Sequence, residues 1–154
     1  NTVWLIMCAL SFGAVIEHLG ILKKIIQLVL QTATSIGGLI TSTVITCIGT
    51  NIITADQYIA IVMPARMYKN VYKERGLDPL VLSRTIEDSG TITSPLIPWN
   101  TCGAYMYSVL MVNPFDYIFY CFFNLINPIL AMIYGYIGFK IKRLVPTMYK
   151  DTNN

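Results

Sequence analysis

The stretch EDSGTITSPLIPWN, from Glu87 to Asn100, decides how this chain folds. It begins with two carboxylates, continues with a run of hydroxyl side chains and contains Pro95 and Pro98 close together. Because proline has no backbone N–H and its ring clashes with the preceding helical turn, a continuous helix cannot pass through this stretch. The stretch therefore predicts a discontinuous helix, in which a polar linker over residues 89–98 is unwound and Pro98 starts a second half-helix.

The sequence around this stretch is typical of a membrane protein. Of its 154 residues, 55% are hydrophobic and 12% are charged, whereas soluble domains carry about 25% charged residues. Residues 25–55, 89–115 and 117–139 contain no Asp, Glu, Lys, Arg or His, and about 20 apolar residues suffice for a helix to cross a bilayer. We therefore expect an all-α membrane protein. The net charge of +3 and the lack of a basic stripe exclude nucleic acid as a partner.

Small and hydroxyl residues dominate residues 35–63, a segment too short for two full membrane crossings. Basic residues flank this segment on both sides, and such residues are enriched at the cytoplasmic ends of membrane helices. If both flanks are cytoplasmic, the segment enters the membrane and returns on the same side. The sequence thus predicts a re-entrant hairpin with its tip near residues 49–54 and a turn at Gly49-Thr50-Asn51.

Membrane spans are expected on either side of these two features. Residues 3–22 are long enough to cross the bilayer. Residues 21–30 are amphipathic and are expected to lie along the membrane interface. Asn113-Pro114 is a helix-start signal, so we expect the last span to cover residues 115–139.

Proline and charge predict further boundaries. Asp78-Pro79 predicts the start of a short helix before the polar linker, and Pro128 predicts a kink in the last span. Basic residues after that span indicate a cytoplasmic end. We expect residues 1–143 to belong to a transmembrane domain and residues 144–154 to form a cytoplasmic tail.

Helices interrupted at membrane depth expose backbone carbonyls and helix ends, which transporters use to bind ions. Both predicted interruptions carry Thr, Ser and Asn side chains, whose neutral oxygens suit hard cations such as Na⁺. Carboxylates beside them could exchange a proton for the cation, and an ionisable group inside a membrane is a functional candidate by default. The candidate cation- and proton-binding residues are Asp56, Glu87, Asp88, Asn51, Thr54, Thr91, Thr93, Ser94, Asn100 and Thr101.

Each of these candidates has a structural alternative. Asp56 could cap a helix or lie at the membrane interface. Glu87 and Asp88 could simply pair with Arg84, which lies one helical turn before them. The hydroxyl and amide side chains could merely satisfy freed backbone groups. We expect Arg84 to be a structural counter-charge rather than a substrate ligand.

Other conspicuous residues predict no sharper function. Glu17-His18 is expected to be interfacial, with a proton relay as the alternative, and Trp99 is expected to be packed rather than to form a lid. The four cysteines lie singly in apolar runs, which favours packing over metal binding or disulfides. No enzyme motif is visible. We therefore expect no enzyme, no cofactor and no metal beyond transported Na⁺.

Several segments resemble one known family. LSRTIEDSGTITSPLIPWNTCGAYM (residues 82–106) closely resembles the signature stretch of NhaC-type Na⁺/H⁺ antiporters, as does GTNIITADQYIAIVMPARMY (residues 49–68). FNLINPILAMIYGYIGFKI (residues 123–141) resembles the last helix of that family, and FGAVIEHLGIL (residues 12–22) resembles another of its helices. The resemblance implies the C-terminal part of a larger multi-pass carrier in the bacterial inner membrane, half of an inverted-repeat transporter. Its partners would be membrane lipid and the missing N-terminal part.

The resemblance implies that the whole protein exchanges Na⁺ for H⁺, which serves sodium tolerance and pH homeostasis. Some relatives instead exchange malate for lactate, coupled to Na⁺ and H⁺. In that case Arg84 and the start of the second half-helix would hold a carboxylate. A membrane scaffold without transport is a third interpretation, which the polar interruptions disfavour because a scaffold needs none. The ion-binding roles of the candidate residues are inferred from their positions.

Overall fold

The computed structural model describes residues 35–139 and 141–143, together with isolated positions between residues 3 and 24. The predicted tail lies outside the described residues. The predicted first span and the interfacial segment are described only at isolated positions, and of Glu17-His18 only His18 is described, as an exposed residue. Within these ranges the chain forms helices and no strand. The helical elements are α3 (Ile36–Thr54), α4 (Gln57–Glu74), α5 (Pro79–Ile86), the π-helical turn η1 (Glu87–Thr91), the 3₁₀ turn η2 (Ser94–Leu96), α6 (Thr101–Leu110), α7 (Pro114–Tyr117), the 3₁₀ turn η3 (Ile118–Tyr120) and α8 (Phe122–Ile137).

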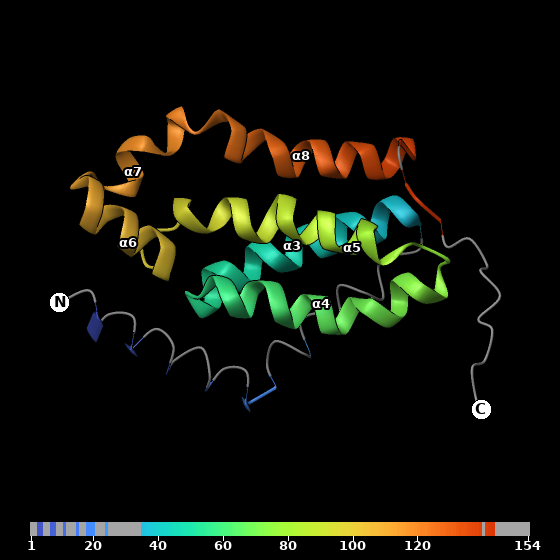
Figure 1. The fold of residues 1–154 in the computed structure, drawn as a ribbon, viewed down its shortest axis with the longest axis horizontal. Coiled ribbons are helices and arrows are strands. Elements are labelled where there is room, and N and C mark those ends of the chain that lie inside the picture. Colours follow the sequence, from blue (N-terminus) through green and yellow to red (C-terminus); the bar gives the residue numbers. More distant parts are fainter. Residues whose placement is uncertain are drawn as a thin grey trace, which may run out of the picture.

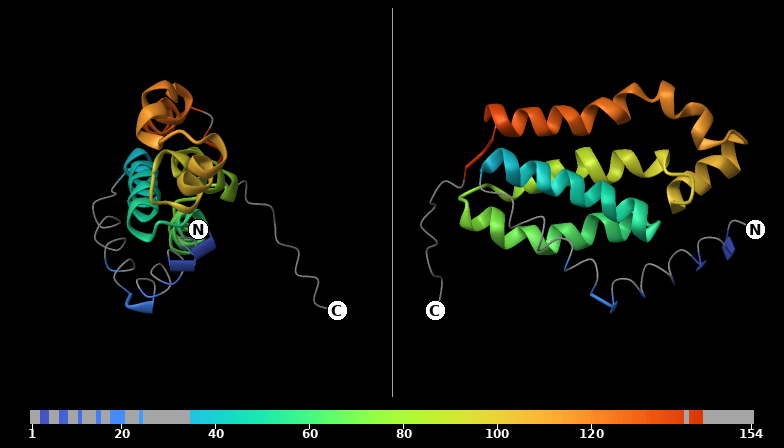
Figure 2. Two further views of the ribbon diagram at one scale, coloured as in Figure 1. Left: turned by 90° about the vertical axis from the view of Figure 1, so that its left-hand side faces the viewer. Right: turned by 180° about the vertical axis from the view of Figure 1, so that it is seen from behind.

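Four of these helices, α3, α4, α5 and α8, lie side by side (Figure 1). Helix α3 contacts each of the other three and is the centre of the bundle. Helices α3 and α5 begin at the end of the molecule where α4 and α8 finish, as the view from behind also shows (Figure 2, right). At that end the backbone N–H of Asp78 donates to the carbonyl of Lys142 at 3.0 Å, which joins the α4–α5 turn to the segment after α8.

Local capping explains where most of these helices begin. A side-chain oxygen at the residue before the helix accepts a backbone N–H in the first turn, which satisfies a donor that the helix itself leaves free. The capping residues are Ser35, Asp56, Asp78, Asn100 and Asn113. The predicted starts at Asp78-Pro79 and Asn113-Pro114 are thus confirmed, and in both helices proline occupies the first turn, where its missing N–H costs nothing.

The predicted hairpin turn at Gly49-Thr50-Asn51 is wrong, because these residues continue α3. The hydroxyl of Thr50 donates to the carbonyl one helical turn earlier at 2.7 Å, so this residue satisfies its polar group within the helix. The chain reverses later, at Ala55, which adopts a left-handed conformation with φ 56°. A helical hairpin does form here, with α4 extending to Glu74, and its re-entrant course in a membrane stays a prediction.

The interruption of the predicted discontinuous helix is also shorter than expected and begins later in the sequence. Residues 89–93 are not unwound, because the π-helical turn η1 and the residues after it keep the chain helical. Pro95 lies in the first turn of η2, where no backbone N–H is required. The helix ends at Ile97, whose backbone is extended, and α6 starts after Asn100 in a new direction (Figure 1). The discontinuous helix is therefore present, with its break at residues 97–100.

The last helical segment bends before the position that the sequence predicts. The bend lies at Cys121, between η3 and α8, and it turns the helix axis by 60°. Pro128 stays inside α8. Among the described residues, α3 is long and apolar enough to cross a bilayer, and the bent pair from Pro114 to Ile137 meets the same criterion if it counts as one span.

Close packing holds the hairpin and α8 together. A side chain at Gly135 of α8 would meet Ile40 of α3 at 3.1 Å, so glycine lets the two helices approach closely.

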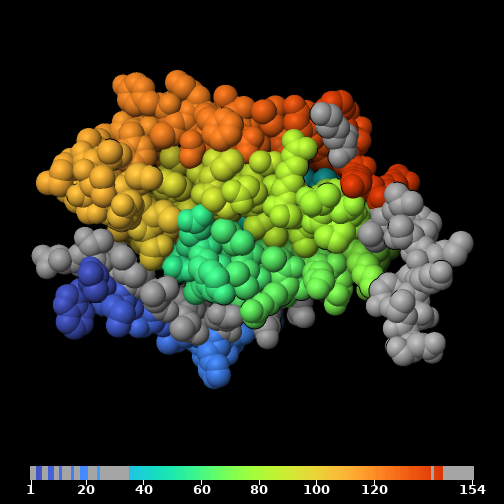
Figure 3. Space-filling model, in the orientation of Figure 1, coloured from blue at the N-terminus to red at the C-terminus, as the bar shows by residue number. Residues whose placement is uncertain are grey.

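Helices α7 and α8 form one edge of the molecule (Figure 3). Many apolar side chains of α6 to α8 are exposed, as expected for a surface that meets lipid or further protein. They include Tyr105, Val109, Met111, Phe115, Phe119, Tyr120, Phe122 and Phe123.

Candidate cation-binding site

The two interruptions of the helices lie against each other. The backbone N–H of Thr101, at the start of α6, donates to the carbonyl of Ala55 in the hairpin turn at 2.9 Å. The indole N–H of Trp99 donates to the carbonyl of Ile52, near the end of α3, also at 2.9 Å. We call this region the junction, and it comprises residues 51–57 of the hairpin and residues 93–102 of the broken helix.

A pair of buried asparagines forms the centre of the junction. The side-chain amide of Asn100 donates to the side-chain oxygen of Asn51 at 3.1 Å, and both residues are 0% exposed. The amide of Asn51 in turn donates to the backbone carbonyl of Gly90 at 2.6 Å and to the hydroxyl of Thr93 at 3.3 Å. Asn51 therefore ties the end of α3 to the π-helical turn and to the residues before the break.

The side-chain oxygen of Asn100 collects several donors. It accepts the hydroxyl of Ser94 at 2.7 Å, the backbone N–H of Cys102 at 3.1 Å and the hydroxyl of Thr101 at 3.4 Å. Asn100 thus caps α6 while it links the two sides of the break. The junction gathers neutral oxygens from both interruptions in a buried space, and such oxygens are the ligands that hard cations prefer.

Asp56 and Thr54 place a carboxylate and a hydroxyl in the hairpin turn of the junction. Asp56 is 5% exposed, and its carboxylate accepts the backbone N–H of Ile59 at 3.0 Å, so it caps α4. The hydroxyl of Thr54 donates to the carbonyl of Thr50 at 2.8 Å. The capping role that the sequence left open for Asp56 is therefore present. Asp56 is therefore both a helix cap and a buried carboxylate beside the polar groups of the junction.

Asp88 lies outside the junction, in contact with α8. One oxygen of its carboxylate accepts the side-chain amide of Asn127 at 2.8 Å, and the other lies 3.5 Å from the guanidinium Nε of Arg84. The side chain of Arg84 is 60% exposed and that of Asp88 is 22% exposed. We call these three residues the Asp88 cluster.

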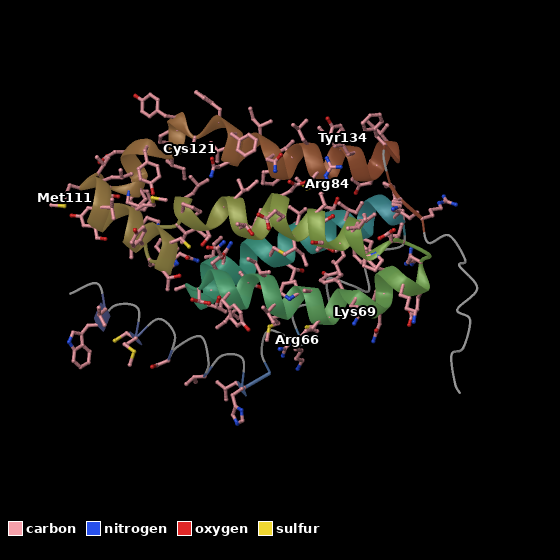
Figure 4. All side chains as sticks on the ribbon, in the orientation of Figure 1. Arg66, Lys69, Arg84, Met111, Cys121 and Tyr134 are labelled. Carbon is pink, nitrogen blue, oxygen red and sulfur yellow. The ribbon has the colours of Figure 1, made fainter. Side chains whose placement is uncertain are left out.

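The Asp88 cluster opens on a pocket between α5 and α8. The pocket has a volume of about 260 Å³, and Arg84, Asp88, Tyr134 and Lys142 contribute to its lining. Arg84 lies between α5 and α8 on the same side of the molecule as Tyr134, away from Arg66 on α4 (Figure 4). The carboxylate of Asp88 is therefore reachable from the pocket, in contrast to the oxygens of the junction.

Glu87 and Thr91 form a separate exposed pair. The hydroxyl of Thr91 donates to the carboxylate of Glu87 at 3.2 Å, along the surface of the π-helical turn. The predicted site residues are thus divided among the junction, the Asp88 cluster and this pair. The structure brings together Asn51, Thr54, Asp56, Thr93, Ser94, Asn100 and Thr101 and separates them from Glu87, Asp88 and Thr91.

Sequence reasoning missed several residues that hold these regions in place. Asn124 of α8 donates to the carbonyl of Ile92 at 2.8 Å, and the thiol of Cys102 donates to Gln57 at 2.6 Å. For the pair Asn127-Pro128 the sequence predicts only a kink. A signal for Asn124 and Asn127 was available, because they lie three residues apart on an apolar helix and therefore share one face.

Known antiporters are similar to this chain over most of its length. The model of the Na⁺/H⁺ antiporter family matches residues 1–139. The Na⁺/H⁺ antiporter NhaC of Alkalihalophilus pseudofirmus is 37% identical over 87% of this chain and 29% of its own length. The arginine/ornithine antiporter ArcD of Halobacterium salinarum is 37% identical over 92% of this chain and 30% of its own. The malate-2H⁺/Na⁺-lactate antiporter of Bacillus subtilis is 35% identical over 86% of this chain and 28% of its own.

No solved structure matches the chain. The chain spans about 30% of the length of these relatives. The resemblance that the sequence segments predict is confirmed, since the family model covers nearly the whole chain. On this evidence the chain belongs to the Na⁺/H⁺ antiporter family.

Proposed function

We propose that this chain is part of a secondary active transporter that exchanges Na⁺ for H⁺ across the bacterial plasma membrane. Family membership supports antiport. The observation that carries the proposal is the junction, where two interrupted helical segments contact each other through a buried asparagine pair. Interrupted helices that meet inside a protein are a recurrent way of building ion sites in secondary transporters.

The side chains of the junction suit a small hard cation. The side-chain oxygen of Asn51 accepts the amide of Asn100, and the hydroxyl oxygen of Thr93 accepts the amide of Asn51. A cation could replace these amide donors as the shared partner of the two oxygens. Helix α3 and the turn η2 both end at the junction, and carbonyl groups at such C-terminal ends favour cations. The N-terminal ends of α4 and α6 are already occupied by their caps.

The carboxylates supply the proton half of the exchange. A carboxylate that binds either a proton or a cation, and never both together, couples the two flows in opposite directions. Asp56 lies at the junction and Asp88 lies at the pocket. We assign the cation- and proton-binding roles to these two residues first, with Glu87 as the exposed third carboxylate.

Exchange of malate for lactate is the second candidate function, because a malate-2H⁺/Na⁺-lactate antiporter is among the relatives. Such a substrate would need free backbone N–H groups at the start of α6. There, the N–H of Thr101 donates to Ala55 and the N–H of Cys102 donates to Asn100. Two of the donors that a carboxylate would use are therefore occupied, which favours the cation.

The remaining architecture is proposed from charge and length. Several basic residues lie where α4 and α8 finish, and this end is assigned to the cytoplasm, with residues 144–154 as a cytoplasmic tail. They are Lys69, Lys73, Arg75, Lys142 and Arg143. Residues 1–143 are assigned to one half of an inverted-repeat transmembrane domain. The exposed apolar surface of α6 to α8 is expected to contact lipid or the rest of the transporter.

The test is transport by the full-length protein in everted membrane vesicles that carry an imposed pH gradient. We expect addition of Na⁺ alone to dissipate the gradient. A requirement for malate or lactate would favour the organic-anion exchanger instead. If no solute moves protons while the protein is present and folded, the scaffold interpretation replaces the transporter.

A further inference from the structure

The carboxylate of Asp88 is held differently from two other carboxylates of the chain. Asp56 and Asp78 each accept a backbone N–H of the helix that they cap. Asp88 instead lies inside the π-helical turn and accepts a side-chain amide from a different helix, that of Asn127. A cap explains the first two carboxylates, and it does not explain the contact between Asp88 and Asn127.

Helix α8 has other docking contacts besides this one. Asn124, one helical turn before Asn127, already joins α8 to the carbonyl of Ile92 at 2.8 Å. Further along, Gly135 packs closely against Ile40 of α3. These contacts fix α8 beside the broken helix at two other points, so the amide of Asn127 is available for another role.

We propose that Asn127 is a positioning residue for ion exchange: it holds one oxygen of Asp88 against α8 and leaves the other oxygen available to a cation arriving through the pocket. The inference rests on the proposed function and adds a residue to it. The two oxygens of Asp88 have different partners, a half-buried neutral amide at 2.8 Å and an exposed guanidinium at 3.5 Å.

These partners differ in how easily a cation displaces them. The ion pair with Arg84 is a largely exposed surface pair, and such pairs contribute little to stability. The hydrogen bond from Asn127 is short and ends on a charged acceptor, which makes it one of the stronger kinds. Because the amide carries no net charge, it orients the carboxylate without competing with Na⁺ for it. A cation could therefore replace Arg84 while Asn127 keeps the carboxylate in place.

The experiment compares Asn127→Ala with the native full-length protein reconstituted in proteoliposomes, with Na⁺ as the added cation. We expect the Na⁺ concentration for half-maximal proton exchange to rise about tenfold, because a hydrogen bond to a charged group is lost. The maximal rate should fall by less than about threefold, since the machinery of exchange is retained. Asn127→Gln keeps an amide donor and should recover most of the native half-maximal concentration.

Asn124→Ala is the matched control, because it removes the same side chain one turn earlier from a contact with backbone. We expect it to lower the amount of folded protein or the maximal rate and to leave the half-maximal Na⁺ concentration unchanged. An equal rise in both alanine variants, or no rise in Asn127→Ala, would overturn the positioning role. If the native protein shows no Na⁺-driven proton movement, the proposed function fails first. If Asn127→Ala does not fold, the other two variants decide. A native half-maximal Na⁺ concentration in Asn127→Gln supports the role. A tenfold rise of that concentration in Asn124→Ala, at a native rate, contradicts it.

Discussion

The junction and the Asp88 cluster use the same kinds of side chain in opposite ways. In the junction, Asn51 and Asn100 are fully buried and satisfy each other and the backbone around them. In the Asp88 cluster, the carboxylate faces a pocket and one of its partners is a largely exposed arginine. The first region is a closed set of oxygens that depends on packing. The second is a charge that solutes can reach and that packing only orients.

The largest expected effect is a loss of stability from a substitution that disturbs only the packing at the junction. A side chain at Gly103 would clash with the carbonyl oxygen of Ile97 at the break of the helix. We expect Gly103→Val to destabilise the protein by about 3 kcal/mol or more, measured as a fall in thermal stability of the full-length protein in detergent. Gly49→Ala is the control, because Gly49 has no atom within 4 Å of the added side chain. If both variants unfold at the native temperature, the junction is not tightly packed.

The next effect separates the network of the junction from ordinary helix capping. Asn100→Ala removes a cap, the amide donor to the side-chain oxygen of Asn51 and the acceptor of the Ser94 hydroxyl. We therefore expect a loss of about 2–4 kcal/mol. Asn113 caps α7 in an exposed position through the N–H of Phe115 at 3.0 Å. Asn113→Ala should therefore cost only about 1 kcal/mol. Equal losses in thermal unfolding would mean that the asparagine pair adds nothing beyond the cap.

Local chemistry made two of the helix starts predictable. Asp78-Pro79 and Asn113-Pro114 specify helix starts through contacts within a few residues, and these starts are confirmed. The turn at Ala55 has no comparable signal, because alanine rarely adopts the left-handed conformation that it has here. The sequence therefore predicts two interruptions and places both of them several residues too early.

The pairing of the interruptions could not be predicted, since it depends on contacts between residues 49 positions apart, Asn51 and Asn100. The division of the carboxylates has the same origin. Glu87 and Asp88 are adjacent in sequence, but the π-helical turn directs Asp88 towards α8 and leaves Glu87 at the surface. Neighbouring positions in a helix point in different directions, so the adjacent Glu87 and Asp88 lie in two different regions.

Removal of charge tests whether both regions take part in transport. Asparagine caps a helix as well as aspartate does, so Asp56→Asn should change the stability by less than about 0.5 kcal/mol. We expect it, and likewise Asp88→Asn, to abolish Na⁺-dependent proton exchange in vesicles while the protein stays inserted and folded. Asp78→Asn, which keeps the cap of α5, is the control that should transport normally. Full activity in Asp56→Asn would mean that this carboxylate acts only as a helix cap. Full activity in both Asp56→Asn and Asp88→Asn would refute the proposed site.

The smallest expected effect concerns how the positive charge of Arg84 influences a cation at Asp88. Arg84 is largely exposed and lies 3.5 Å from Asp88, so Arg84→Gln should change the stability by about 1 kcal/mol or less. Because a positive charge beside Asp88 opposes a second cation, we expect the half-maximal Na⁺ concentration to fall about two- to threefold. Lys142→Gln removes an equally exposed charge, one that lies 3.6 Å from Asp78, and should leave that concentration unchanged. If both variants shift it equally, the effect comes from the overall charge around the pocket, and the contact between Arg84 and Asp88 has no part in exchange.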